Sequence, residues 1–196
     1  MIRYFTAHKV LSTVLTLILC ATTTNFACHT QDWLNTIGQY LPLAIQIAQA
    51  IVQLVPIFAS NAGSDDQALV KQISDEATKD FQLLQSLYQQ YQSKPSPDTK
   101  AAIENALAVI VTNLPQMLAT SHIKDQILLD KVTASVNVLV TVADIIISAI
   151  PVTNPQLVAR KAQAKMKAVK QTPQTIKIQW NTQVCGLDPK CMALVH

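Results

Sequence analysis

The sequence predicts an all-α fold, an up-down four-helix bundle followed by a basic C-terminal helix and a short disulfide-stapled tail. With 196 residues, of which 49% are hydrophobic and 14% charged, the chain can bury one sizeable core. Three glycines and 5% aromatic residues argue against β-sandwiches and phosphate-cradling α/β folds, because both use glycine at turns and close backbone approaches. In addition, several long segments carry their polar residues at helical spacing.

Residues 1–27 have the organisation of an export signal peptide. Arg3 and Lys9 precede the apolar run from Val10 to Leu19, and a short polar stretch ends at Ala27. The apolar run is too short to span a membrane stably, so we expect cleavage and export, with a retained anchor as the alternative. The mature chain then divides into a bundle domain, residues 28–153, and a basic helix with its stapled tail, residues 154–196.

Cleavage after Ala27 makes Cys28 the first mature residue, the position of the lipidated cysteine in bacterial lipoproteins. The segment from Asn25 to Cys28 resembles that motif in its last two residues, whereas Asn25 and Phe26 depart from it. Cys28 is therefore a candidate lipidation site, and a free or intermolecular thiol is the alternative.

We expect Cys185 and Cys191 to form a disulfide, since an exported chain favours pairing and the five residues between them contain turn-forming glycine and proline.

The first bundle helix is expected between Trp33 and Ser60, regular from about Tyr40 to Val55 because Pro42 and Pro56 lie near its ends. Its amides share one sector of a helical projection. They are Asn35, Gln39, Gln46, Gln49 and Gln53.

The second helix is predicted from a Ser64/Gln67 capping box to about Gln92, and its apolar residues recur every three or four positions. Ser96 and Pro97 start the third helix, which Pro115 must kink or end.

The fourth helix, between His122 and Pro151, combines a wide apolar surface with one narrow polar stripe. The stripe consists of Gln126, Asp130, Thr133, Asn137, Thr141, Asp144 and Ser148. We expect Asp144 to face solvent with the rest of the stripe; a polar line facing another helix or a lumen is the alternative.

Charge is distributed unevenly, because residues 28–155 hold 6 basic and 11 acidic side chains whereas residues 156–196 hold 7 and 1. A basic helix should run from Pro155 to about Gln171, with an apolar side made by Val158, Ala162, Met166 and Val169. The alternation of Ile176, Ile178 and Trp180 with polar residues then predicts a short strand or extended segment.

The basic helix is expected to be solvated or docked onto the acidic body, and contact with an anionic surface such as lipid or cell-wall polymer is the functional alternative. The candidate residues are Arg160, Lys161, Lys165, Lys167 and Lys170. Nucleic acid is not expected as a partner, because stacking aromatics are lacking and the signal exports the chain.

The sequence predicts no enzyme activity, metal or cofactor. His29, His122 and His196 lie far apart, and Gly38, Gly63 and Gly186 form no nucleotide-binding or hydrolase motif. We expect an exported, non-catalytic protein of the cell envelope that binds or scaffolds, in contact with the membrane surface or another envelope protein. The alternative is a membrane-inserting, pore- or holin-like protein whose charge-poor helices leave the bundle.

Overall fold

The computed structural model describes residues 32–168 and 171–196, and within these ranges all regular structure is helical. This confirms the all-α prediction. The predicted signal peptide and Cys28 lie outside the described residues. The elements are a first helix, residues 32–50, η1 (Ile51–Gln53), α2 (Leu54–Phe58), α3 (Ser64–Ser93), α4 (Pro97–Thr120), α5 (Gln126–Ala149), α6 (Pro155–Ala168), α7 (Pro173–Gln179), η2 (Trp180–Val184) and α8 (Pro189–Met192).

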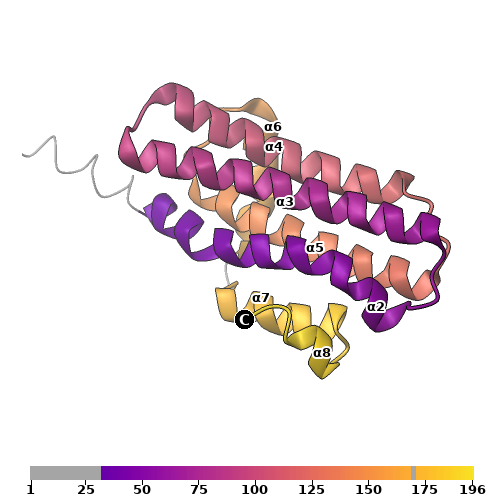
Figure 1. Cartoon of the computed structure of the whole chain (residues 1–196). Helices are drawn as coiled ribbons and strands as arrows, with labels where there is room; N and C mark the ends of the chain where they lie inside the picture. The colour runs from indigo at the N-terminus through magenta and orange to yellow at the C-terminus, as the bar shows by residue number, and fades with distance from the viewer. Residues whose placement is uncertain (1–31, 169–170) are drawn as a thin grey trace, which may run out of the picture.

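Four long helical segments run side by side and form the predicted bundle (Figure 1). α3 packs on α4 and α4 packs on α5, while the segment Asp32–Phe58 contacts both α3 and α5. One continuous hydrophobic core fills the space between them. The C-terminal part of the chain adds α6 against α5 and α4, and then a tail that packs on α5 and α2.

α5 is the central wall of this core. The predicted polar stripe is at least partly exposed at Gln126, Asp130, Asn137 and Thr141, whereas Val136 on the opposite side is 1% exposed. Branched aliphatic side chains cover most of the remaining circumference, as expected for a helix that packs on nearly all sides. Asp144 departs from the prediction, because it is buried and only 3% exposed.

The first helical segment is longer than predicted, since it is continuous from Asp32 to Phe58 and includes both prolines. Trp33 holds its start against the bundle, with its ring centroid 5.0 Å from that of Tyr91 in α3. The 3-10 turn η1 precedes Pro56 and tightens the helix just where the proline nitrogen cannot donate. Tertiary packing therefore extends the helix beyond the limits that proline alone suggests.

Pro115 does not end α4, which continues to Thr120. The proline is on the exposed side of the helix, where its ring does not meet the core and one backbone hydrogen bond is lost without ending the helix. Ser96 is the N-cap as predicted, and its hydroxyl oxygen accepts a hydrogen bond from the Thr99 amide.

The start of α3 differs from the predicted capping box. Gly63 is the N-cap, and the Gln67 side-chain amide donates to the Ala62 carbonyl at 2.8 Å. Asp66 in the first turn accepts hydrogen bonds from the backbone amides of Lys124 and Asp125, at 3.0 and 2.9 Å. These two bonds lower the pKa of Asp66 and fasten the start of α5 to the start of α3.

The predicted strand around Ile176 is wrong, because this segment forms α7 and the π-helical turn η2. Thr172 and Thr175 form a reciprocal capping box, and Pro173 occupies the first turn. Ile176 and Trp180 lie four residues apart on the buried face, while Ile178 is 51% exposed. The buried residues therefore recur at helical spacing, although apolar and polar residues alternate along this part of the sequence.

Candidate functional site

The basic helix α6 is fixed to the bundle rather than free in solvent, and its five candidate cations have different surroundings. Arg160 contacts Asp144 of α5, and Lys161 donates to the Ile150 carbonyl at the end of α5. Lys165 is exposed. The side chain of Lys167 and the whole of Lys170 lie outside the described residues.

α6 packs through a different face from the predicted apolar one. Leu157 and Ala164 are buried, whereas Val158 and Met166 are 52% and 76% exposed. The buried face carries Arg160, whose contact with the body orients the helix. Hydropathy misassigned this face because it places Arg160 on a polar side of the helix and Val158 and Met166 on the packed side.

Arg160 and Asp144 form a charge-assisted pair between α6 and α5. The Arg160 Nε lies 2.6 Å from Asp144 Oδ1, and Nη2 lies 3.3 Å from Oδ2. This fork geometry satisfies both carboxylate oxygens at once. The alternative interpretation of Asp144, a polar group facing another helix, is thus the correct one, and the expectation of a solvent-facing carboxylate is wrong.

Glu104 of α4 forms a second attachment, at the connection between α5 and α6. Its Oε2 accepts hydrogen bonds from the backbone amides of Thr153 and Asn154, each at 2.8 Å, and from the Thr153 hydroxyl at 3.0 Å. Oε1 accepts from Lys100 at 2.7 Å, and the same ammonium group donates to the Pro151 carbonyl. Burial raises the pKa of Glu104, but these donors outweigh burial and the pKa is lowered.

Lys161 is the least solvated of the described α6 lysines. Its ammonium group is drawn towards the last turn of α5, where unpaired carbonyl groups favour cations. Burial and the nearby charges of Lys165 and Lys100 lower its pKa, against an opposing effect of Glu104. The basic helix therefore uses part of its charge to bind the acidic body.

A surface groove of about 430 Å³ runs beside these attachments, between α4 and α6. Its lining comes from Ala108, Val111, Thr112, Gln156, Leu157, Ala159, Arg160 and Gln163.

No protein-family model, curated protein or solved structure matches this chain. Across residues 32–168 and 171–196, no three His, Cys, Asp or Glu side chains are grouped closely enough to hold a metal ion.

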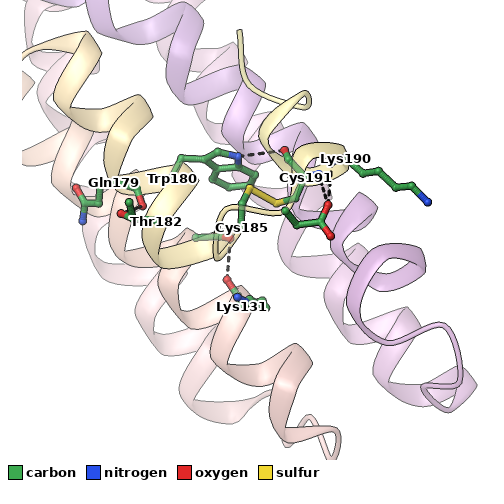
Figure 2. The surroundings of a disulfide bond; sticks show 9 residues. Lys131, Gln179, Trp180, Thr182, Cys185, Lys190 and Cys191 are labelled. Atoms are coloured by element: carbon green, nitrogen blue, oxygen red, sulfur yellow. Dashed lines mark hydrogen bonds between the residues drawn. A yellow bond between two sulfur atoms is a disulfide. The ribbon is translucent and has the colours of Figure 1, made fainter.

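The C-terminal tail is closed by the predicted Cys185–Cys191 pair, whose sulfur atoms lie at bonding distance, 2.11 Å apart (Figure 2). The Trp180 indole nitrogen points towards the Cys191 carbonyl at 3.4 Å (Figure 2). Gly186 and Leu187 follow with φ of 58° and 67°, a left-handed pair that turns the chain back within the six-residue span. The disulfide prediction is thus confirmed, and the loop rests against Lys131 of α5.

Sequence reasoning did not identify Glu104, although the sequence contains a signal for it. Glu104 is the single charge between Lys100 and Lys124, in a segment that otherwise alternates between apolar and uncharged polar residues. A lone carboxylate in such a helix usually has a partner when buried. Its partners are backbone amides about 50 residues away, which no local pattern reveals.

Proposed function

We propose that this protein is an exported, non-catalytic helical-bundle protein of the cell envelope that acts by binding or scaffolding. Its N-terminal segment supplies the export signal, and lipidation of Cys28 is one means by which it stays at the membrane. Its partners are the membrane surface or another envelope protein, contacted through the α6 side of the bundle. Nucleic acid is not among the partners that we propose.

The observation that carries this proposal is the attachment of α6 to the body by Glu104 and by the Arg160–Asp144 pair. These contacts fasten the connection after α5 to α4 and hold α6 on α5. A closed bundle presents a fixed outer surface, which suits recognition and scaffolding. Lys165 remains exposed on that surface as a contact for anionic groups.

Membrane fractionation of the native protein with and without Cys28→Ala tests the lipoprotein part of the proposal. We expect the unchanged protein in the membrane fraction and the variant in the soluble envelope fraction, because a lipid chain adds apolar area that the alanine side chain cannot supply. The double change Cys185→Ser with Cys191→Ser is the control, since it alters cysteines far from Cys28 in the sequence. An unchanged distribution of Cys28→Ala would contradict lipidation.

The second candidate function is membrane insertion. Three helices of the described chain are long and apolar enough to cross a bilayer: Asp32–Phe58, Pro97–Thr120 and Gln126–Ala149. Between 44% and 61% of their most apolar windows is already buried inside the bundle. Insertion therefore requires the bundle to open and its polar attachments to break.

Anionic liposomes loaded with a dye distinguish the two functions. For the scaffold, we expect at most surface binding that salt weakens, because each basic residue near anionic lipid contributes about 1 kcal/mol of screened attraction. We expect no leakage, since the apolar faces that already pack in the core gain little by moving into lipid. Leakage that survives high salt, and that Val140→Lys with Ile147→Lys abolishes, would favour the membrane-inserting protein instead.

A further inference from the structure

A second pocket lies between α3 and α4, and Asn105 at its edge accepts a hydrogen bond of 3.1 Å from the Asn154 side chain at the start of α6. Its volume is about 340 Å³, within the lower range of small-molecule sites. The lining is apolar apart from Asp80 and Asn105, and it includes Leu83, Leu87, Ala102, Ala106 and Val109. Leu83 and Val109 are exposed at its edge, 51% and 41% respectively.

Asp80 is the unusual member of this lining. The residue is only 7% exposed, and its Oδ2 is buried without a hydrogen-bond donor among the described residues. The neighbouring cation does not neutralise it, because the Lys79 ammonium group pairs with Glu76 at 3.3 Å. Each of the other buried carboxylates, on Asp66, Glu104 and Asp144, has backbone or cationic donors.

We propose that this pocket binds a small primary amine with an apolar body, whose ammonium group pairs with the Asp80 carboxylate. The aliphatic or aromatic part of the ligand then lies on Leu83, Leu87 and Val109. This inference rests on the proposed binding function, because it names a ligand class for a non-catalytic bundle. It does not depend on where the protein resides.

Charge selects an amine over other small apolar molecules. An unpaired carboxylate at the wall of an apolar pocket is costly unless a cation neutralises it, so an ammonium group gains more here than a hydroxyl group does. A ligand carboxylate would meet repulsion from the Asp80 carboxylate. Burial, and then the charge of Glu76, raise the pKa of Asp80 despite the opposing effect of Lys79, which agrees with a carboxylate that lacks a partner.

Titration of the purified full chain at neutral pH with hexylamine, hexanol and hexanoate, followed by amide chemical shifts in NMR spectra, tests the proposal. The three probes have the same chain length and differ in the charge of the head group. We expect hexylamine to bind about ten times more tightly than hexanol, and hexanoate more weakly than both. The largest shifts should fall on α3 and α4 around Asp80.

Three variants assign this preference to the pocket. Asp80→Asn should keep the fold, because it removes an unpaired charge, and should make hexylamine and hexanol bind equally. Ala102→Phe should abolish binding of both, since Ala102 is half-buried at the pocket and the ring can cover it. Asp75→Asn, which removes an exposed carboxylate that pairs with Lys71 on the same helix, should change nothing.

The outcomes also separate this inference from the proposed function. Absence of hexylamine binding, equal binding of hexylamine and hexanol, or a preference that survives Asp80→Asn would overturn the amine site. None of these results would alter the fractionation of the Cys28→Ala variant or the liposome experiment. If the pocket accepted only the lysine side chain of a partner protein, hexylamine would not bind. The proposed small-amine site would then be overturned as well.

Discussion

Val136→Asp is expected to unfold the bundle or to leave it close to unfolding. Val136 is 1% exposed at the inner side of α5 and belongs to the hydrophobic core of the bundle. An uncompensated buried charge costs about 3 to 5 kcal/mol, and the lost apolar packing adds to this. Because whole domains are stable by only about 5 to 15 kcal/mol, the variant should lose most of its stability.

Thr141→Asp is the matched control for Val136→Asp. Thr141 lies on the same helix, five residues later, but it is partly exposed and its hydroxyl group donates within α5 to the Asn137 carbonyl. A carboxylate there can remain hydrated, so we expect a cost of about 1 kcal/mol or less. Thermal and urea unfolding followed by circular dichroism measure both variants. Equal losses would mean that the buried face of α5 is wrongly assigned.

The helices and the buried faces of the bundle could be predicted because polar spacing along a long helix reports solvent exposure directly. The amide stripe of the first helix and the apolar repeat of α3 are examples, and both lie on the faces that the sequence indicated. The disulfide was predictable from a different signal, the short turn between Cys185 and Cys191 in a chain expected to be exported. Each of these signals is local, because it can be recognised within a single helix or turn.

The candidate site was less predictable because its contacts join residues that are far apart in the sequence. Asp144 fits a solvent-facing stripe until Arg160 is placed opposite it, and α6 shows its correct face only after that pairing is known. Asp80 likewise resembles an ordinary helix-surface carboxylate, since its burial depends on how α4 packs across α3. Sequence periodicity reports the average environment of a helix and does not report its partners.

The second large effect is expected for Glu104→Gln, which keeps the shape of the side chain but removes its charge. The glutamine carbonyl can accept some of the donors from Thr153 and Asn154, while its amide nitrogen then faces the Lys100 ammonium group. Hydrogen bonds to a charged group contribute about 1.5 to 3 kcal/mol each, and several are weakened together. We therefore expect a loss of about 3 kcal/mol in the free energy of unfolding, with the connection between α5 and α6 opening first.

This loss should depend on pH in a direction set by the lowered pKa of Glu104. A carboxyl group whose pKa is lower in the folded chain stabilises the fold fully above its ordinary value of 4.5, and this contribution is lost as pH falls through the folded pKa. The unchanged protein and Glu104→Gln should therefore differ most near neutral pH and converge in acid. Asp130→Asn, which removes an exposed carboxylate of α5, provides the control and should cost less than about 1 kcal/mol. Urea unfolding at pH 7 and pH 3 measures all three proteins, and a difference that is as large at pH 3 as at pH 7 would show that Glu104 does not act through its charge.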